Sequence, residues 1–446
     1  MKKYALVAIL FFCREGMAQP CTDLNLGTKT PYSTHAATHP ASPAGYTAVF
    51  INHAGRHGAR HMTKDLSESD SYHLLQTADS MHALSASGRE LWQMVQRLNV
   101  VEHTEVKNIS RLGKQEQQGI GERMGANYPT VFAVPHPALN VTVTKEIRTL
   151  QSADAFLAGL KNKITLPVMR LQINDTTLRF YDLSPAYQQF KDSGRWTATL
   201  RQLEAAEKFS QLSAKAADRF FTPDYMQGTG PAGRQSFAAD VVGYANILHS
   251  LPAELKEAGL GGEALRFTRF FSCDELRAFS RIDNAEEFLV KGPGTDPAGL
   301  QVRIAAPLLI DFIRTTDNYI SAQPYQAELR FTHAEAIAPF AALMGIQGAS
   351  TPAKTGPAIA TAWNAAKVVP LSANIQWILY KKKGSHNYMI KFLLNEQEAR
   401  IEGLAAKQFP YYAWKDVRKF YLNKLQQIKA SLNTDGITYL RGLSEP

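Results

Sequence analysis

Short apolar runs of β-forming residues alternate along this chain with longer runs of helical periodicity. Residues 46–51 (Tyr-Thr-Ala-Val-Phe-Ile) form an apolar run that is typical of a buried strand. Residues 139–144 and 168–173 alternate between apolar and polar positions, and this pattern also predicts strands. Residues 327–332 indicate a further strand, and a helix-like stretch follows it.

Helical patterns occupy most of the remaining chain. Residues 64–100 look helical, and Ser85 and Ser110 stand at positions that suit helix N-caps. Further helices are predicted at 152–160, 200–216, 238–248, 275–290, 305–314 and 336–344. Together these elements predict an α/β fold, with a Rossmann-like, mostly parallel sheet flanked by helices.

One long stretch of the chain contains few strand signals. Residues 183–299 are dominated by helical patterns, with Gly and Pro clustered at 228–233 and 292–298. We interpret this stretch as a helical insertion that caps the sheet. Residues 19–182 and 300–446 are then expected to form the α/β core, and a length of 446 residues allows two or three domains.

The composition describes an ordinary globular protein, since 45% of the residues are hydrophobic and 20% are charged. The formal net charge of +9 and the pI of about 9.2 suit an anionic partner such as nucleic acid, a membrane surface or a polyphosphate. No recognised nucleic-acid module is present, and no segment has the length and apolarity of a membrane span. The sequence therefore predicts neither a nucleic-acid partner nor a membrane span.

The first 18 residues have the pattern of a secretory signal peptide. Lys2 and Lys3 precede an apolar run at 4–13, and Gly-Met-Ala at 16–18 resembles a small-x-small cleavage site. We therefore expect residues 1–18 to be removed and the protein to be exported, to the periplasm or the extracellular space.

The chain beyond the signal peptide contains two cysteines, Cys21 and Cys273. An exported setting permits a disulfide, but a pairing over so long a stretch cannot be inferred from the sequence. The residues around Cys273 favour a buried position in a helix.

The strand at 46–51 leads into the densest chemical motif of the chain, Arg56-His57-Gly58-Ala59-Arg60. Gly55 and Gly58 are expected to break regular structure there. Arginine forks match the oxygens of a phosphate, and a neutral imidazole among them can attack phosphorus. The plain alternative is a basic loop in which the arginines and the histidine are merely crowded.

A metal site is a second alternative, because His53, His57 and His61 recur at four-residue spacing. The glycines between them argue against a helix, and no cysteine pair or His-Glu-x-x-His pattern supports zinc. We therefore expect neither a metal nor another cofactor.

Two other predicted strands end in residues that suit an anion site. Arg148 follows the strand at 139–144 and precedes the helix at 152–160, where the helix dipole would help it to bind an anion. A surface arginine in a connecting loop is the plain alternative. His333 and Glu335 follow the strand at 327–332, so two strand ends can bring them into one crevice with His57.

These motifs resemble those of a known family. Arg56-His57-Gly58-Ala59-Arg60 resembles the signature of the histidine phosphatase superfamily, in its acid-phosphatase and phytase branch, although Met62 stands where that signature has proline. The segments around Ser85, Ser110 and Arg148 are similar to its helix starts and to its third phosphate-binding arginine. His333-Ala334-Glu335 resembles the motif of the multiple inositol polyphosphate phosphatases, which are phytases. The C-terminal segments resemble the paired strands of that group at 368–380 and 391–396 and its later segment at 410–414.

The resemblance implies a reaction in two steps. His57 forms a phosphohistidine, while Arg56, Arg60, Arg148 and His333 hold the phosphoryl oxygens. Glu335 protonates the departing alcohol and then activates water, which requires a raised pKa or an acidic working pH. Lys64 is the first candidate among the lysines for binding further substrate phosphates.

The expected substrates are inositol hexakisphosphate and lower inositol polyphosphates. A broad-specificity acid or sugar phosphatase on the same scaffold is the first alternative. An exported phosphoryl-ligand binding protein without turnover is the second.

Overall fold

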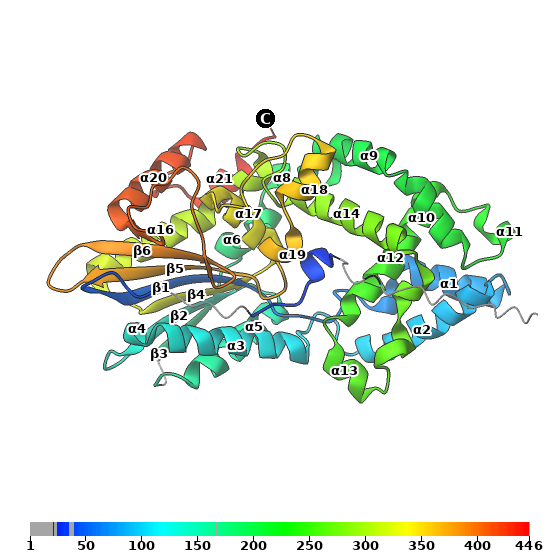
Figure 1. The fold of residues 1–446 in the computed structure, drawn as a ribbon, viewed down its shortest axis with the longest axis horizontal. Helices are drawn as coiled ribbons and strands as arrows, with labels where there is room; N and C mark the ends of the chain where they lie inside the picture. Colours follow the sequence, from blue (N-terminus) through cyan, green and yellow to red (C-terminus); the bar gives the residue numbers. More distant parts are fainter. Residues whose placement is uncertain (1–20, 22–24, 35–39, 166–167, 446) are drawn as a thin grey trace, which may run out of the picture.

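The computed structural model describes residues 21, 25–34, 40–165 and 168–445, so the expected signal peptide lies outside the described residues. In the part that is described, no helix has both the length and the apolarity needed to cross a membrane. A mixed sheet lies at one end of the molecule in Figure 1, and a group of helices lies at the other.

The sheet has a parallel half and an antiparallel half. Its strands are β1 (Tyr46–Arg56), β2 (Ala138–Val143), β3 (Val168–Ile173), β4 (Ala327–Thr332), β5 (Asn374–Lys382), β6 (Tyr388–Leu394), β7 (Gln397–Glu398) and β8 (Tyr411–Ala413). Their order is β3-β2-β4-β1-β5-β6-β7, with β8 paired to β6. Strands β3, β2, β4 and β1 are parallel, whereas β5 to β8 pair antiparallel with their neighbours. The predicted α/β fold with a mostly parallel core is confirmed.

Helices cover both faces of the sheet (Figure 1). One face packs against α3 (Arg111–Asn127), α4 (Pro129–Phe132) and α5 (Ile147–Lys161). The other face packs against α6 (Asp175–Leu178), α7 (Phe180–Leu183), α8 (Pro185–Ser193), α15 (Leu300–Arg303), α16 (Ala306–Ala322), α17 (Ala334–Met344), α18 (Gly356–Ala362), α19 (Ala365–Val368), α20 (Trp414–Gln427) and α21 (Gly436–Arg441). Strand alternation divides the apolar residues between these faces: Ile51 and Ile378 face the first group, and Phe50 and Trp377 face the second.

A third apolar cluster holds the helical part together, and it combines two regions of the sequence. Its elements are η2 (Leu66–Glu68), α1 (Asp70–Ser80), α2 (Ala86–Glu102), α9 (Trp196–Ala206), α10 (Phe209–Asp218), α11 (Pro223–Met226), α12 (Pro231–Leu248), α13 (Pro252–Glu257), η3 (Gly262–Leu265), η4 (Phe267–Phe270) and α14 (Cys273–Val290). Helices α1 and α2 thus pack with the helices of the expected insertion. The domain boundaries at 183 and 299 stay predictions.

Two local expectations near the motif are wrong. Gly55 does not end the strand, because β1 is central and Gly55 is in register with Phe331 of β4 and Asn374 of β5. Pairing on both sides keeps the glycine extended up to Arg56. Helix α5 begins at Ile147 rather than at Ser152, so Arg148 lies in its first turn.

The two cysteines form a disulfide, Cys21–Cys273, with a Cα–Cα distance of 5.6 Å. Cys273 is the first residue of α14, so its expected place in a helix is confirmed, but it is half-buried and the expected burial is wrong. The disulfide attaches the start of the described chain to the helical region. Beyond it, η1 (Gly27–Lys29) lies close to the motif at the end of β1.

Close backbone packing joins the motif to α3. Ser110 caps this helix by accepting a hydrogen bond from the Gly113 amide (3.2 Å), and the predicted N-cap role of Ser110 is confirmed. A Cβ on Gly113 would lie 2.0 Å from the carbonyl oxygen of Ala59, and a Cβ on Gly58 would lie 2.6 Å from that of Gly113. Both glycines are therefore needed for the loop after β1 to contact α3 so closely.

We expect Gly113→Ala to lower the free energy of unfolding by about 1–3 kcal/mol, because the new methyl group overlaps backbone that must then move. Gly243→Ala in α12 is the control, since a Cβ there meets no atom within 4 Å. That change should be neutral or should stabilise by up to about 1 kcal/mol through helix propensity. Urea unfolding followed by circular dichroism measures both. Equal effects in the two variants would contradict the packing role of Gly113.

Candidate active site

Three neighbouring strands end at the same edge of the sheet, and each leads into a residue of the predicted site. Strand β1 ends at Arg56, β2 leads to Arg148 in the first turn of α5, and β4 leads to His333, the N-cap of α17. The order β2-β4-β1 places these ends side by side. The rings of His57 and His333 are 5.5 Å apart, so the structure brings the two motifs together.

His57 is held as a neutral imidazole in a defined tautomer. Its Nδ1 lies 2.9 Å from the carbonyl oxygen of Gly58. Because a carbonyl can only accept, Nδ1 carries the proton and Nε2 carries the lone pair. Burial, together with the positive charge of Arg56 and the nearby ring of His333, holds the pKa of His57 well below its usual value of 6.5. The lone pair of Nε2 is therefore present at any working pH near neutrality.

Arg56 is buried and is held by backbone carbonyls rather than by a carboxylate. Its Nη1 donates to the oxygens of Thr28 and Val369, both at 2.7 Å. The buried Nε atoms of Arg56, Arg60 and Arg148 all lack a hydrogen-bond partner. A buried N–H without a partner is costly, so three such groups around one imidazole suit an oxygen-rich anion.

The positive charges repel one another. Burial and the neighbouring Arg56 and Arg148 lower the pKa of Arg60 to about 10. Burial, Arg60 and Arg56 lower the pKa of Lys29 to about 8. Lys29 belongs to η1, far from the motif in sequence, and nothing in the sequence analysis singled it out. A bound phosphate would relieve this repulsion.

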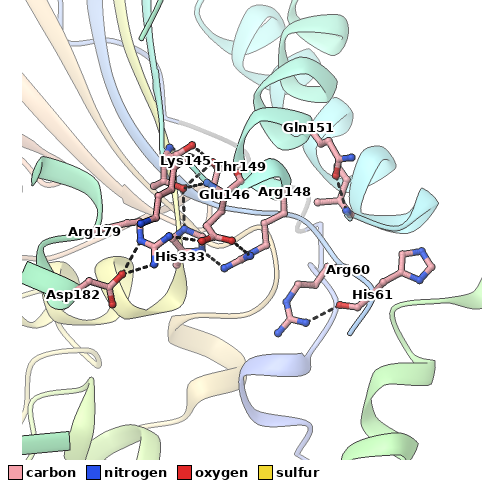
Figure 2. Close-up of polar contacts among 12 residues, drawn as sticks. Arg60, His61, Lys145, Glu146, Arg148, Thr149, Gln151, Arg179, Asp182 and His333 are labelled. Carbon is pink, nitrogen blue, oxygen red and sulfur yellow. Dashed lines mark hydrogen bonds and ion pairs between the residues drawn. The ribbon is translucent and has the colours of Figure 1, made fainter. Parts of the chain in front are cut away.

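Arg148 connects the site to a row of polar groups (Figure 2). Its Nη2 lies 3.2 Å from Nδ1 of His333, and Nε2 of His333 lies 3.1 Å from the hydroxyl of Thr144. Since a guanidinium only donates, Nδ1 of His333 accepts and its Nε2 carries the proton. Burial and Arg148 lower the pKa of His333 to about 3, so this ring is also neutral.

Glu146 forms an ion pair with Arg148 and orients its side chain. Its carboxylate accepts from Nη1 of Arg148 at 2.8 Å and from Nη1 of Arg179 at 2.5 Å, and Arg179 also pairs with Asp182 (Figure 2). These ion pairs fix the direction of Arg148 and leave its Nε unpartnered. In Figure 2 the side chains of Arg60 and Arg148 extend in the same general direction from their separate segments.

Glu335 lies in the first turn of α17, and Lys291 faces it at 3.2 Å. Burial by itself would raise the pKa of Glu335, but Lys291, His333 and Arg56 together hold it well below its usual value of 4.5. Of the two expected conditions, a raised pKa is therefore not met in the free protein, and an acidic working pH stays a prediction. Lys291 was missed as a site residue, because the sequence indicated only a helix end at that position.

The loop that carries His57 is fixed by side chains from α3 and α5. The amide of Ala59 donates to Glu116 at 2.9 Å, and the amide of Gly58 donates to the hydroxyl of Ser152 at 3.0 Å. Lys64 is exposed on the segment that follows, and its part in substrate capture stays a prediction. Within the described ranges, no group of three or more His, Cys, Asp or Glu side chains is arranged to hold a metal ion.

Two solved structures of similar fold are those of an inositol polyphosphate phosphatase and a phytase. The chain resembles the crystal structure of the Bifidobacterium longum multiple inositol polyphosphate phosphatase in complex with inositol hexasulfate, with a TM-score of 0.76 and 19% identity over 92% of this chain and 98% of that one. It also resembles the phytase of D. castellii, with a TM-score of 0.61 and 13% identity over 93% and 86% of the two chains.

The sequence comparisons give the family. A search of curated proteins finds no match. The family model of the histidine phosphatase superfamily (branch 2) matches residues 55–395, which is more than half of the chain and includes the motifs that end at Arg60 and at Glu335. The protein is therefore a member of the histidine phosphatase superfamily, in its branch 2.

Proposed function

We propose that this histidine phosphatase is an exported phytase, which hydrolyses inositol hexakisphosphate and lower inositol polyphosphates through a phosphohistidine. The observation that carries the proposal is the neutral His57 imidazole among three arginines whose buried Nε groups lack partners. The likeness in fold to an inositol polyphosphate phosphatase and to a phytase supports the choice of substrate.

The first step forms the phosphohistidine. Nε2 of His57 attacks phosphorus, while Arg56, Arg60 and Arg148 bind the phosphoryl oxygens and stabilise the charge that develops. Nδ1 keeps its hydrogen bond to the Gly58 carbonyl, so the attacking lone pair stays directed away from the backbone. The P–O bond to the inositol ring then breaks.

Glu335 supplies the proton that the departing alkoxide requires. It is ionised in the free protein because Lys291 and, to a smaller extent, Arg56 stabilise the carboxylate, but a bound phosphate adds negative charge that opposes this effect. Substrate binding thus raises the pKa of Glu335 and allows it to take up a proton. In the second step the same carboxylate, now ionised again, removes a proton from the water that attacks the phosphohistidine.

One observation favours the alternative of an acid or sugar phosphatase. A cavity of about 460 Å³ near Lys29 is lined by Glu204, Asp283, Glu286 and Glu287. Carboxylates repel the extra phosphates of a polyanion but can accept hydrogen bonds from the hydroxyl groups of a sugar phosphate. The deciding experiment measures phosphate release from inositol hexakisphosphate and from sugar monophosphates, with inositol products resolved by isomer. Preference for the monophosphates would replace the phytase proposal, and binding without release from either would leave the non-catalytic alternative.

We expect His57→Ala to lower turnover by about 10³–10⁶-fold without loss of fold, because no neighbouring group can form the covalent bond. Rapid acid quench with labelled substrate should trap an acid-labile phosphoprotein in the unmodified protein and none in the variant. His73→Ala, which removes an exposed imidazole from α1, is the control and should behave as the unmodified protein. A trapped phosphoprotein in the His57 variant would show that another group is the nucleophile.

Replacing Glu335 by Gln should separate substrates by their leaving group. Phosphorylation by inositol hexakisphosphate should slow by about 10²–10⁴-fold, because the alkoxide needs a proton. Phosphorylation by p-nitrophenyl phosphate should change little, because nitrophenolate leaves without a proton. The pre-steady-state burst measures this step apart from the later attack of water. Equal losses with both substrates would exclude Glu335 as the proton donor.

The pH dependence should report the effect of bound phosphate on Glu335. The acid form of Glu335 is the active form in the first step, so activity on an alkyl phosphate falls as pH rises through its pKa. Since this pKa is low in the free protein and higher in the complex, the fall in kcat should occur at higher pH than the fall in kcat/KM. Initial rates from pH 3 to pH 8 measure both limbs. Coincident limbs would mean that bound phosphate does not change the pKa of Glu335.

A further inference from the structure

Helix α14 reaches the candidate active site with its C-terminal end. Lys291 is its C-cap residue, and Nζ of Lys291 lies 3.2 Å from Oε1 of Glu335. The same Nζ lies 2.8 Å from Oε1 of Glu287, one helical turn earlier. One ammonium group from the helical region is therefore shared between two carboxylates, of which one is the proposed proton donor.

We propose that Lys291 is a positioning residue that sets the charge state and the direction of Glu335, and that Glu287 limits this effect by drawing part of the ammonium charge to itself. The inference rests on the proton-donor role in the proposed function, and it requires only phosphomonoesterase activity. It does not depend on which phosphomonoester is the natural substrate.

The partial burial of the three groups makes the pairing stronger than one on the surface. The side chains of Lys291, Glu287 and Glu335 are 17%, 15% and 35% exposed. Water screens such pairs less than it screens exposed ones. Oε2 of Glu287 is buried and has no hydrogen-bond partner, whereas its Oε1 is paired with the ammonium of Lys291.

Lys291 differs from the other titratable groups that face Glu335. The remaining groups are His333, Arg56, Arg60, Tyr181 and Tyr187. The arginines carry unpartnered N–H groups, and a bound phosphate would compensate their charge. Lys291 is already bound to two carboxylates, so it continues to act on Glu335 when the phosphate is in place. It can therefore set how readily the donor is protonated in the complex.

The two partners of this pairing should have opposite effects. Without Lys291 the carboxylate of Glu335 loses a stabilising positive charge, so its pKa rises. Without the charge of Glu287 the ammonium turns fully to Glu335 and a repelling carboxylate is lost, so the pKa of Glu335 falls. Since the acid form is active in the first step, the pH at which kcat/KM falls should move in the same direction as this pKa.

The test uses the full-length processed protein and two simple substrates, 2-glycerophosphate with an alkoxide leaving group and p-nitrophenyl phosphate. In Lys291→Gln the falling limb of kcat/KM for 2-glycerophosphate should move to higher pH by about one unit or more. In Glu287→Gln it should move to lower pH. Lys291→Arg should restore the limb of the unmodified protein. The ionisation of the substrate is the same for every variant, so it does not contribute to these differences.

A control on the same helix separates this local effect from a change in net charge. Arg277→Gln removes one positive charge from an exposed pair with Asp274, 3.5 Å away in α14. In this variant the falling limb of kcat/KM for 2-glycerophosphate should lie at the same pH as in the unmodified protein. With p-nitrophenyl phosphate, the burst of nitrophenolate should keep its pH dependence in all four variants, because that leaving group needs no proton.

Two results would overturn the inference. One is an unchanged limb for 2-glycerophosphate in a folded Lys291→Gln variant, and the other is a shift in the same direction for Lys291→Gln and Glu287→Gln. If Lys291→Gln does not fold, the direction of the Glu287→Gln shift decides. Opposite shifts in a protein that does not cleave inositol hexakisphosphate would keep the inference and overturn only the proposed substrate.

Discussion

The site depends on positive charges that are held close together without a carboxylate for each. Arg56 is fixed by the carbonyls of Thr28 and Val369, and Arg60 donates to the carbonyl of His61. A carbonyl satisfies an N–H group but does not cancel its charge. The field therefore stays strong where His57 lies, adds to the effect of burial in keeping that imidazole neutral, and is available to an anion. The remainder of the fold supplies the stability that keeps these charges together.

Two carboxylates near the site have supporting roles: Glu116 binds backbone amides, and Glu146 orients Arg148. Glu116 accepts from the amides of Tyr32 and Ala59, so it joins the N-terminal segment to the loop after β1. Glu146 binds Nη1 of Arg148 at 2.8 Å (Figure 2). Neither carboxylate binds the Nε groups of Arg56, Arg60 and Arg148, which have no hydrogen-bond partner. Gly58 and Gly113 also hold the site in place, because the close contact that they permit fixes the loop after β1 against α3.

The sequence predicted what local pattern determines. The strands at 168–173 and 327–332 have the predicted bounds. Alternation of apolar and polar residues is a local signal, so it predicts a strand without knowledge of its neighbours in space. Contacts between segments that are distant in the sequence could not be predicted from local pattern. The helix predicted at 275–290 ends at the same residue as α14, but periodicity does not tell where in space a helix ends. The pairing of Cys21 with Cys273 likewise depends on the fold, and Gly55 stays in a strand because neighbouring strands pair with it.

Glu335 connects the two parts of the molecule. Its backbone belongs to the first turn of α17, whereas its nearest cation, Lys291, comes from the end of a helix that packs in both the helical cluster and the core. A carboxyl group that must first donate a proton and later accept one needs a pKa near the working pH, so that neither its acid form nor its ionised form dominates. Lys291 makes the largest contribution to the ionised form of Glu335, and the arginines add to it until phosphate compensates them. The acid step therefore depends on a contact made across the fold, in addition to the motif in which Glu335 stands.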